Sequence, residues 1–366
     1  MLVAEEKLIT DMPNTALASI AEKVLSNRRL TPQEGLFLLE TPESEAVREM
    51  ADFARQARVG DEVLFSTTLF IHPTNLCELS CPMCSYYAKP GWKSAWFLSP
   101  EDVENKVRKH PGINEVHIVG GLWRDCDLNY YQDVFSRIKT VDPTIHIKAL
   151  SPVEYDFLAR HHNLSIEQVF EKMISFGLGS LPGGGAEILD EKIREVIAPG
   201  KISSNRYLEI HKIAHSIGLP SNITMLFGHI EELSDIVAHL CTVRDLQDET
   251  GGFGCFVPLK YHTENNALSK SCHKLKPKDI NRIYAVSRLM LDNIDHLKVL
   301  WNYVGEKEAI EALSHGANDF GSAALEEKVS GADKTLTYDT VSELIRALGR
   351  KPRHVHSGKN RCSNRL

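Results

Sequence analysis

The sequence predicts an α/β protein built as a TIM-type (β/α)8 barrel, preceded by a helical extension. Eight short apolar segments of strand-like composition follow one another over about 260 residues. Segments of amphipathic helical composition separate most of them, and this alternation is typical of a closed parallel barrel. The last strands have the weakest patterns, so a partial barrel of six strands is the alternative.

The helical extension comes first along the chain. Residues 14 to about 58 have helical composition, and Thr31 and Glu34 stand at the spacing of a capping box around Pro32. We expect three parts, which are an N-terminal helical extension over 1–60, a barrel over 61–345 and a C-terminal tail over 346–366. The tail is basic and polar from Arg350 onward, so we expect it to fray.

The strands and helices of the barrel follow from the apolar patterns. Helices are expected at 100–110, after Ser99 as N-cap, and at 203–217 and 233–247. The expected strands are 63–71, 115–119, 145–150, 179–181, 221–227, 253–259, 296–301 and 317–321.

The charge balance and hydropathy exclude some classes of protein. Lysine and arginine number 42 and aspartate and glutamate 49, a formal charge of −7, which argues against a dominant role in binding nucleic acid. No apolar run approaches the roughly 18 residues that span a bilayer. The first 20 residues lack the apolar core of a signal peptide, so we expect a cytoplasmic protein without a membrane span.

Three of the eight cysteines lie together, at Cys77, Cys81 and Cys84. Thiolates are the ligands that iron–sulfur clusters favour, and three of them leave one iron of a four-iron cluster open to a second molecule. The motif follows the first predicted strand, which places it at the C-terminal face of the barrel, where active sites lie. A zinc site is the alternative, but no second cysteine pair follows at finger spacing.

Glycines follow two of the predicted strands. Gly120 and Gly121 end the second strand, where bare backbone can pair with a ligand, although a tight turn would also explain them. Gly184 and Gly185 belong to a run of three glycines after the fourth strand, where close approach of a ligand is the better explanation. Glu187 comes next and could accept hydrogen bonds from a ribose or an ammonium group, or simply favour a helix N-terminus.

Polar side chains lie in or beside other predicted strands. Lys148 lies inside the third strand, where it either faces the barrel mouth or is solvated, and Glu154 flanks the end of that strand. Asn222 and Thr224 share one face of the fifth strand, which suggests a ligand pocket. His229 follows them as a candidate proton donor or carboxylate partner, or as a core histidine.

The spacing of the three cysteines resembles the signature of the radical S-adenosylmethionine superfamily. The resemblance implies a 4Fe–4S cluster on those cysteines and S-adenosylmethionine as co-substrate. Met83 stands where this family often has an aromatic residue, and Leu122 replaces an acidic residue after the glycine pair. Our candidates for binding S-adenosylmethionine, of which the resemblance itself implies the glycine pair, are Met83, Gly120, Gly121, Glu154, Gly184, Gly185 and Glu187.

Longer blocks resemble the menaquinone and deazaflavin branch of this superfamily, and most of all the aminofutalosine synthase family. They include 181–188, 197–201 and 246–253. Two departures are the segment 122–126, where family members have a His-Pro pair, and 318–322, which is closer to the related cyclase and deazaflavin synthase.

The resemblance implies a reaction in the futalosine route to menaquinone. The reduced cluster cleaves S-adenosylmethionine, and the 5'-deoxyadenosyl radical adds to 3-[(1-carboxyvinyl)oxy]benzoate with loss of carbon dioxide or bicarbonate. A flavodoxin or ferredoxin is the expected reductant. The candidates for holding the substrate carboxylates are Lys148, Asn222, Thr224 and His229.

Two other functions remain open at this point. One is a sister reaction, that of the cyclic dehypoxanthine futalosine synthase or of the deazaflavin cofactor synthase. The other is a non-catalytic iron–sulfur protein for electron transfer or redox sensing. The many glycine-rich strand ends argue against the second.

Overall fold

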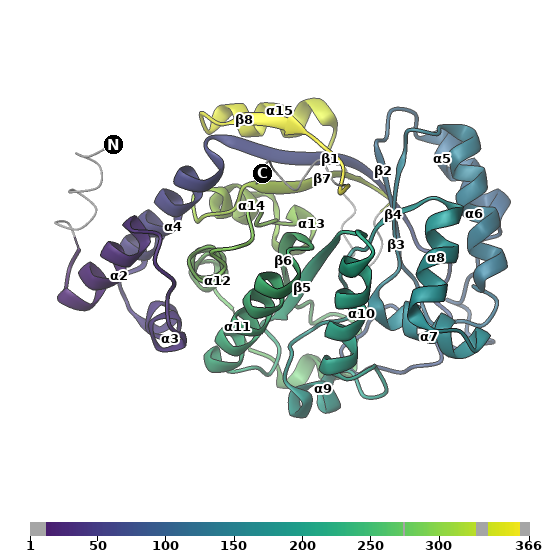
Figure 1. Ribbon diagram of the computed structural model, residues 1–366, viewed down its shortest axis with the longest axis horizontal. Helices are drawn as coiled ribbons and strands as arrows, with labels where there is room; N and C mark the ends of the chain where they lie inside the picture. The colour runs from purple at the N-terminus through teal and green to yellow at the C-terminus, as the bar shows by residue number, and fades with distance from the viewer. Residues whose placement is uncertain (1–11, 274, 327–335, 359–366) are drawn as a thin grey trace.

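The computed structural model describes residues 12–273, 275–326 and 336–358. A closed barrel of parallel strands lies at its centre and helices surround it (Figure 1). The strands are β1 (Glu62–Ile71), β2 (Glu115–Ile118), β3 (His146–Ala149), β4 (Leu178–Ser180), β5 (Ser221–Phe227), β6 (Phe253–Lys260), β7 (Asp319–Leu325) and β8 (Lys351–His354).

The barrel closes through two hydrogen-bonded sheets and three single bridges. One sheet has the order β4-β3-β2-β1-β7 and the other pairs β5 with β6. Leu181 bridges to Ser221 between the two sheets on one side. On the other side the short segment 297–298 bridges Phe256 to Asp319 and acts as a further strand of the barrel. Counting this segment, eight parallel strands surround the axis, and the predicted barrel is confirmed.

A side-chain network holds the weak segment in place. The buried guanidinium of Arg288 donates to the carbonyls of Gly316 (2.7 Å) and Asp295 (3.0 Å) and to Asn318 Oδ1 (2.7 Å). Asn318 Oδ1 also accepts from the Leu297 amide at 3.0 Å. Burial lowers the pKa of Arg288 to about 9. The segment therefore follows the barrel because side chains fix its backbone, and not because a long apolar run pairs it with neighbours.

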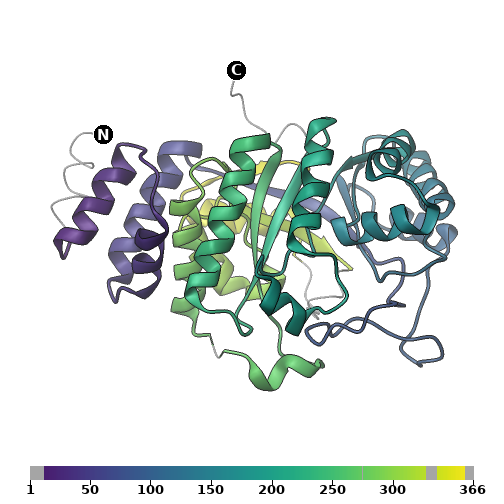
Figure 2. The same cartoon turned by 60° about the horizontal axis from the view of Figure 1, so that its bottom comes forward.

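Helices on the outside of the barrel cover the strands, and Figure 2 shows them from a second direction. Capping side chains mark many of their ends, including Ser99 and Ser203, as the sequence predicts. The helices are α2 (Thr15–Leu25), α3 (Pro32–Glu40), α4 (Ser44–Val59), α5 (Pro100–Lys109), α6 (Leu128–Val141), α7 (Pro152–His162), α8 (Ile166–Phe176), α9 (Glu191–Ile197), α10 (Ser204–Ser216), α11 (Leu233–Thr250), η1 (Ala267–Ser271), α12 (Pro277–Met290), α13 (Trp301–Val304), α14 (Glu306–Leu313) and α15 (Tyr338–Ala347).

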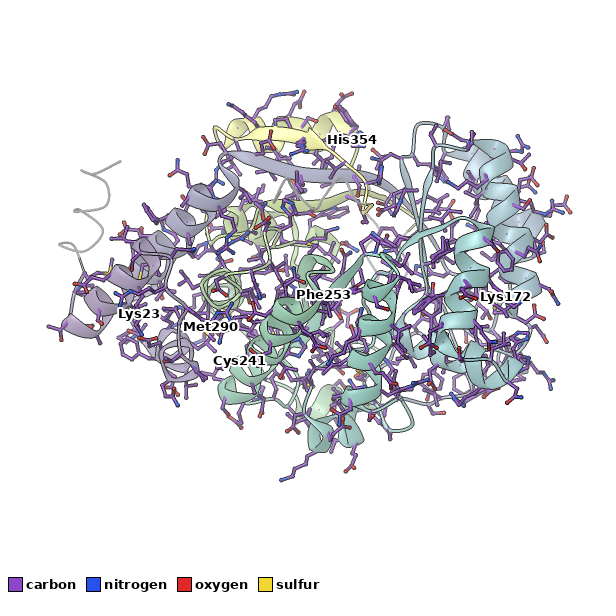
Figure 3. All side chains as sticks on the ribbon, viewed as in Figure 1. Lys23, Lys172, Cys241, Phe253, Met290 and His354 are labelled. Atoms are coloured by element: carbon purple, nitrogen blue, oxygen red, sulfur yellow. The ribbon has the colours of Figure 1, made fainter. Side chains whose placement is uncertain are left out.

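Of the three N-terminal helices, α3 and α4 pack against the barrel helices α11 and α12, and α2 packs on the outer side of α4. Thr31 and Glu34 form the predicted capping box at the start of α3. Met290, labelled in Figure 3, is fully buried at the end of α12 and reaches α3, where a Cβ on Gly35 would lie 2.7 Å from its sulfur. The helical extension and the barrel therefore share one apolar core.

The expected fraying of the tail from Arg350 is wrong for the residues that the structure describes. Strand β8 pairs in parallel with residues 62–65 of β1, on the edge that β2 occupies further along. Its side chains are mostly exposed, so the sequence carries no apolar pattern that would reveal a strand. Residues 359–366 of the expected tail lie outside the described residues.

No helix within the described ranges combines the length and the apolar character needed to cross a bilayer.

We predict that Met290→Ala lowers the free energy of unfolding by roughly 2–5 kcal/mol, because it leaves a cavity between α12 and α3. Urea unfolding measures the change. Ile174→Ala on α8 is the control, because that side chain is 40% exposed and its loss should cost less than about 1 kcal/mol. Equal effects of the two changes would contradict a shared core.

Candidate active site

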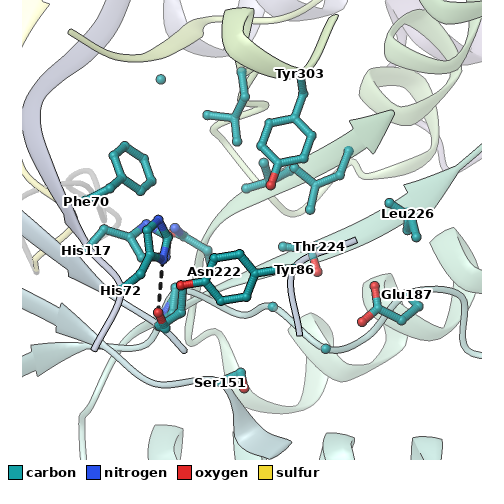
Figure 4. A pocket seen from close by; sticks show the side chains of 18 of the residues that line it. Phe70, His72, Tyr86, His117, Ser151, Glu187, Asn222, Thr224, Leu226 and Tyr303 are labelled. Atoms are coloured by element: carbon teal, nitrogen blue, oxygen red, sulfur yellow. Dashed lines mark hydrogen bonds between the residues drawn. The ribbon is translucent and has the colours of Figure 1, made fainter. Parts of the chain in front are cut away.

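The barrel encloses a cavity of about 330 Å³. The loop 72–99, which follows β1, contributes to its lining through His72, Met83 and Cys84. Figure 2 shows this loop projecting from the same end of the barrel as α9. Figure 4 shows strand side chains such as Phe70 and Thr224 around the hollow, together with Tyr86 from the cysteine loop and Tyr303 from α13. The cavity thus extends from the cysteine loop into the polar interior of the barrel.

Backbone hydrogen bonds shape the cysteine loop. The Cys84 amide donates to the Cys81 carbonyl at 3.0 Å, and the Cys77 amide donates to the Ala88 carbonyl at 3.1 Å. Lys89 Nζ donates to three successive carbonyls, of Cys77, Glu78 and Leu79, at 2.9–3.0 Å. Sequence reasoning missed this role of Lys89, because a single lysine in a loop carries no spacing signal.

The surroundings of the cysteine sulfur atoms are suited to ligands of an iron–sulfur cluster. The Leu122 amide donates to Cys77 Sγ and the Tyr86 amide donates to Cys84 Sγ, both at 3.4 Å. Such N–H···S bonds stabilise the negative charge of cluster thiolates. Burial raises the pKa of the Cys81 thiol to about 11, so Cys81 stays protonated in the absence of metal. Within the described ranges, no group of three or more His, Cys, Asp or Glu side chains is placed to hold a single metal ion.

The two glycines after β2 serve different purposes. Gly120 lines the cavity and its amide donates to Glu154 Oε1 at 3.0 Å. Gly121 does not line the cavity. A Cβ there would lie 2.1 Å from the Leu76 carbonyl oxygen, so Gly121 lets the cysteine loop approach β2. The tight-turn alternative is thus closer to the structure for Gly121, and a ligand contact remains open for Gly120.

The three glycines after β4 also divide into two kinds. Gly183 and Gly185 have positive φ, and a Cβ on Gly183 would lie 2.1 Å from the Asn222 carbonyl oxygen. Gly184 lines the cavity, has an ordinary φ, and has no atom within 4 Å of the position of a Cβ. The outer two glycines are therefore required by the fold, and the middle one leaves space in the cavity.

Glu187 pairs with Lys201 at the cavity wall. Glu187 is buried with a left-handed backbone (φ 52°), and Lys201 Nζ donates to its Oε1 at 2.6 Å. Burial alone would raise the pKa of Glu187, but the adjacent ammonium outweighs it and lowers that pKa. Lys201 also interacts electrostatically with Cys81 and Cys84. The sequence reasoning named Glu187 and missed Lys201 as its partner.

Glu154 begins α7 with a capping box and faces the cavity. Its Oε2 accepts from the amide and the hydroxyl of Ser151, both at 2.7 Å. Burial is the largest effect on the carboxyl and raises its pKa. Glu154 therefore joins the end of β2 to the start of α7.

Asn222 and Thr224 on β5 both face the cavity, as predicted. Thr224 donates to the Gly183 carbonyl at 3.0 Å, which leaves it a supporting role for the glycine turn. Asn222 is only 5% exposed and lines the cavity. A buried amide that faces an open cavity is suited to a polar ligand.

Two lysines lie at the inner end of the cavity. Lys148 is 3% exposed and forms an ion pair with the fully buried Glu115 on β2. Lys298 is 4% exposed and lies 3.5 Å from Asp319 Oδ2 on β7. Both line the cavity, so of the two alternatives left open for Lys148 the structure shows the inward-facing one. Sequence reasoning missed Lys298, because the segment around it has no clear strand pattern.

His117 on β2 lines the same region and stacks on Phe70, with ring centroids 4.9 Å apart. Burial, followed by the nearby Lys148, lowers the pKa of His117 well below its usual value. The imidazole is therefore neutral at physiological pH. An uncharged His117 ring can donate or accept a hydrogen bond at the cavity surface.

His229 does not line the cavity. It is fully buried, its Nε2 lies 3.1 Å from the Leu226 carbonyl oxygen, and its Nδ1 lies 3.0 Å from Glu231 Oε2. Burial lowers its pKa. The placement matches the alternative of a core histidine, because the backbone turns outward after Phe227.

Comparison with known proteins agrees with this geometry. Residues 71–240 match the radical SAM superfamily, and residues 250–360 match the CofH/MqnC C-terminal region. An aminodeoxyfutalosine synthase of Thermus thermophilus is 33% identical over 92% of this chain and 93% of its own length.

Relatives with other names are as similar. A 5-amino-6-(D-ribitylamino)uracil–L-tyrosine 4-hydroxyphenyl transferase of Methanoculleus marisnigri is 37% identical over 86% of this chain and 88% of its own length. A cyclic dehypoxanthine futalosine synthase of Streptomyces coelicolor is 34% identical over 92% of this chain and 86% of its own length.

Among solved structures, methylornithine synthase (PylB) has the same fold, with a TM-score of 0.74 at 18% identity over 91% of this chain and 97% of that chain. The cysteine loop at the mouth of the barrel, the sequence match and the extent of the relatives lead to one conclusion. The chain belongs to the radical SAM superfamily, whose members use a 4Fe–4S cluster and S-adenosylmethionine, in the group that contains the aminodeoxyfutalosine synthases and the CofH- and MqnC-related enzymes.

Proposed function

We propose that this enzyme is an aminodeoxyfutalosine synthase of the futalosine route to menaquinone. In this reaction the 5'-deoxyadenosyl radical adds to the vinyl group of 3-[(1-carboxyvinyl)oxy]benzoate, and one carboxylate leaves as carbon dioxide or bicarbonate. The relatives alone do not select this reaction, because those with three different names are 33–37% identical to the chain.

The observation that carries the proposal is the pair of buried lysines at the inner end of the cavity. Lys148 and Lys298 approach it from β3 and from the segment before α13, and Asn222 faces it from β5. Ammonium groups and an amide are suited to carboxylates. A substrate with two carboxylates matches two lysines, whereas a ribitylaminouracil carries no carboxylate and tyrosine carries one.

In this proposal one end of the cavity binds the cluster and S-adenosylmethionine, and the other end binds the substrate. Cys77, Cys81 and Cys84 would hold the cluster, which supplies the electron that cleaves S-adenosylmethionine when both are bound. Glu187, Glu154 and the Gly120 backbone lie on the wall between the cysteine loop and the lysines. These groups are suited to the ammonium, hydroxyl and carboxylate groups of S-adenosylmethionine.

The chain's own contribution to the rate is positioning. The lysines and Asn222 would hold the substrate so that its vinyl carbon meets the radical carbon as soon as the radical forms. Such placement converts a bimolecular step into an effectively unimolecular one. Aromatic and aliphatic side chains line the rest of the cavity, among them Phe70, Val257 and Leu259, and keep water from the radical.

A sister reaction is the second candidate, and the segment 318–322 is the observation that favours it. Asn318 in this segment bonds Arg288, Leu297 and His296, so its role is in the fold. Gly321 and Ser322 line the cavity and are the part of the segment that could affect substrate choice. We further propose a flavodoxin or ferredoxin as electron donor, as the family resemblance implies.

We predict that anaerobically purified protein holds about four irons per chain. Changing any one of Cys77, Cys81 or Cys84 to Ala should remove most of the iron and all turnover. Iron analysis and visible absorbance measure the effect. Cys241→Ala is the matched control, because Cys241 lies on α11 outside the cavity. Loss of iron in Cys241→Ala with retention in Cys81→Ala would show that the ligands are misassigned.

We predict that Gly184→Ala folds normally and raises the KM for S-adenosylmethionine about tenfold, because the added methyl group enters the cavity. Gly183→Ala should instead fail to fold, because its methyl group meets the Asn222 carbonyl. Gly254→Ala is the neutral control, since its nearest neighbour is 4.0 Å away. Unchanged kinetics in Gly184→Ala would reduce the glycine run to a structural turn.

The reaction itself is tested with S-adenosylmethionine labelled in its adenine. With 3-[(1-carboxyvinyl)oxy]benzoate as substrate, we expect the label in a larger aromatic nucleoside, together with released carbon dioxide or bicarbonate. Chromatography with mass detection measures both. Label that appears only in free 5'-deoxyadenosine during productive turnover would exclude radical addition and favour a sister reaction.

A further inference from the structure

Beside the lysine end of the cavity, the segment 355–358 contacts the buried ion pair of Lys148 and Glu115. It follows β8, and its first residues are fixed to the N-terminal half of the barrel. The Val355 amide donates to the Phe65 carbonyl of β1 at 2.8 Å, and Asn114 Nδ2 donates to the Val355 carbonyl at 2.9 Å. The same Asn114 accepts from the Thr67 amide at 3.0 Å. The segment is therefore joined to β1 and to the start of β2.

Ser357 connects this segment to the charged pair beside the cavity. Its amide donates to Glu115 Oε2 at 2.6 Å, and its hydroxyl accepts from Lys148 Nζ at 3.1 Å. The other oxygen of Glu115 accepts from Lys148 and, at 3.1 Å, from the Thr68 hydroxyl. Ser357 is 6% exposed and Glu115 is fully buried, so water has little access to these bonds.

His356 holds the segment against β3. Its ring stacks on His146 of β3, with centroids 4.7 Å apart and planes 16° from parallel. His146 in turn lies 2.7 Å from the Ser180 hydroxyl on β4. The Gly358 amide lies 3.0 Å from His356 Nδ1. The segment therefore contacts β1, β2 and β3 directly, and His146 links it to β4.

These contacts matter because a buried ion pair is stable only when its remaining donors and acceptors are satisfied. Ser357 supplies both a donor for Glu115 and an acceptor for Lys148. Glu115 and Ser357 both hold the Lys148 ammonium, and together they restrict its orientation. Since Lys148 also lines the cavity, Ser357 influences what that ammonium presents to a ligand.

We propose that Ser357, in the segment 355–358, is a positioning residue for the substrate site and acts through Lys148. The ligand class is a carboxylate, and its identity as 3-[(1-carboxyvinyl)oxy]benzoate rests on the proposed function. Ser357 does not touch the substrate. It holds the ammonium in the orientation in which the ammonium meets the carboxylate.

The test compares Ser357→Ala with Ser342→Ala. Ser342, on α15, is also buried, and its hydroxyl makes no hydrogen bond within the described chain, so it is a matched control. We expect Ser357→Ala to raise the KM for the carboxylate substrate about three- to tenfold, the range expected for the loss of one typical hydrogen bond. The KM for S-adenosylmethionine should stay unchanged in both variants, and so should the melting temperature within a few degrees.

A double-mutant cycle separates positioning from general destabilisation. In a Lys148→Gln background, Ser357→Ala should cause no further rise in KM. An additional rise equal to that in the wild type would overturn the proposal, as would a Ser357→Ala protein with a wild-type KM. If Lys148→Gln does not fold, Ser357→Thr serves instead, because it keeps the hydroxyl and should keep the wild-type KM. Equal impairment of Ser357→Thr and Ser357→Ala would also overturn the proposal.

The wild-type enzyme is first assayed with the substrates of all three candidate reactions. If only a sister substrate gives product, the proposed function is wrong, and the Ser357 variants are measured with the carboxylate of that substrate. The substrate assay therefore tests the proposed function, and the KM values of the Ser357 variants test the role of Ser357 separately.

Discussion

The need to pair every charge inside the barrel shapes the rest of this structure. Three of the described lysines that line the cavity have a carboxylate partner on another element, in the pairs Lys148–Glu115, Lys298–Asp319 and Lys201–Glu187. An unpaired ammonium or carboxylate at these depths would cost several kcal/mol. Each pair therefore also acts as a cross-link, between β2 and β3, between the segment 297–298 and β7, and between the glycine turn and the loop after α9.

Because the interior of the barrel is polar, most of its hydrophobic stabilisation must come from the apolar cores outside the strands. In a barrel whose centre is packed with branched apolar side chains, the interior contributes much of the hydrophobic stabilisation. Here the apolar residues gather between the strands and the surrounding helices, in one large core that includes the N-terminal helices and a second under α5, α6 and α8. Because these outer cores hold the barrel, its centre can keep an open cavity lined by polar groups.

The sequence predicts those parts of the molecule that are governed by local patterns. The apolar runs of β1 to β6 and the spacing of the cysteines are local, and the structure places both where they were expected. The parts that were missed depend on contacts between distant residues. Strand β8 is exposed and exists because β1 has a free edge, and Lys298 faces inward because Arg288 and Asn318 fix the backbone around it. His229 was expected at the site, but the turn after β5 directs it into the core.

The two ends of the cavity are held by separate sets of contacts, and this separation has a consequence for the family. At the cysteine loop, the hydrogen bonds run mainly to backbone atoms, as with Lys89 and the carbonyls of residues 77–79. At the inner end, side chains alone define the surface, through Lys148, Lys298 and Asn222. Backbone contacts survive most substitutions. A change of one inward-facing side chain, by contrast, alters which ligand the inner end of the cavity can bind. Relatives named for different reactions can therefore share one fold and one arrangement of the cysteine loop. We expect their difference in substrate to depend on a few side chains at the inner end of the cavity.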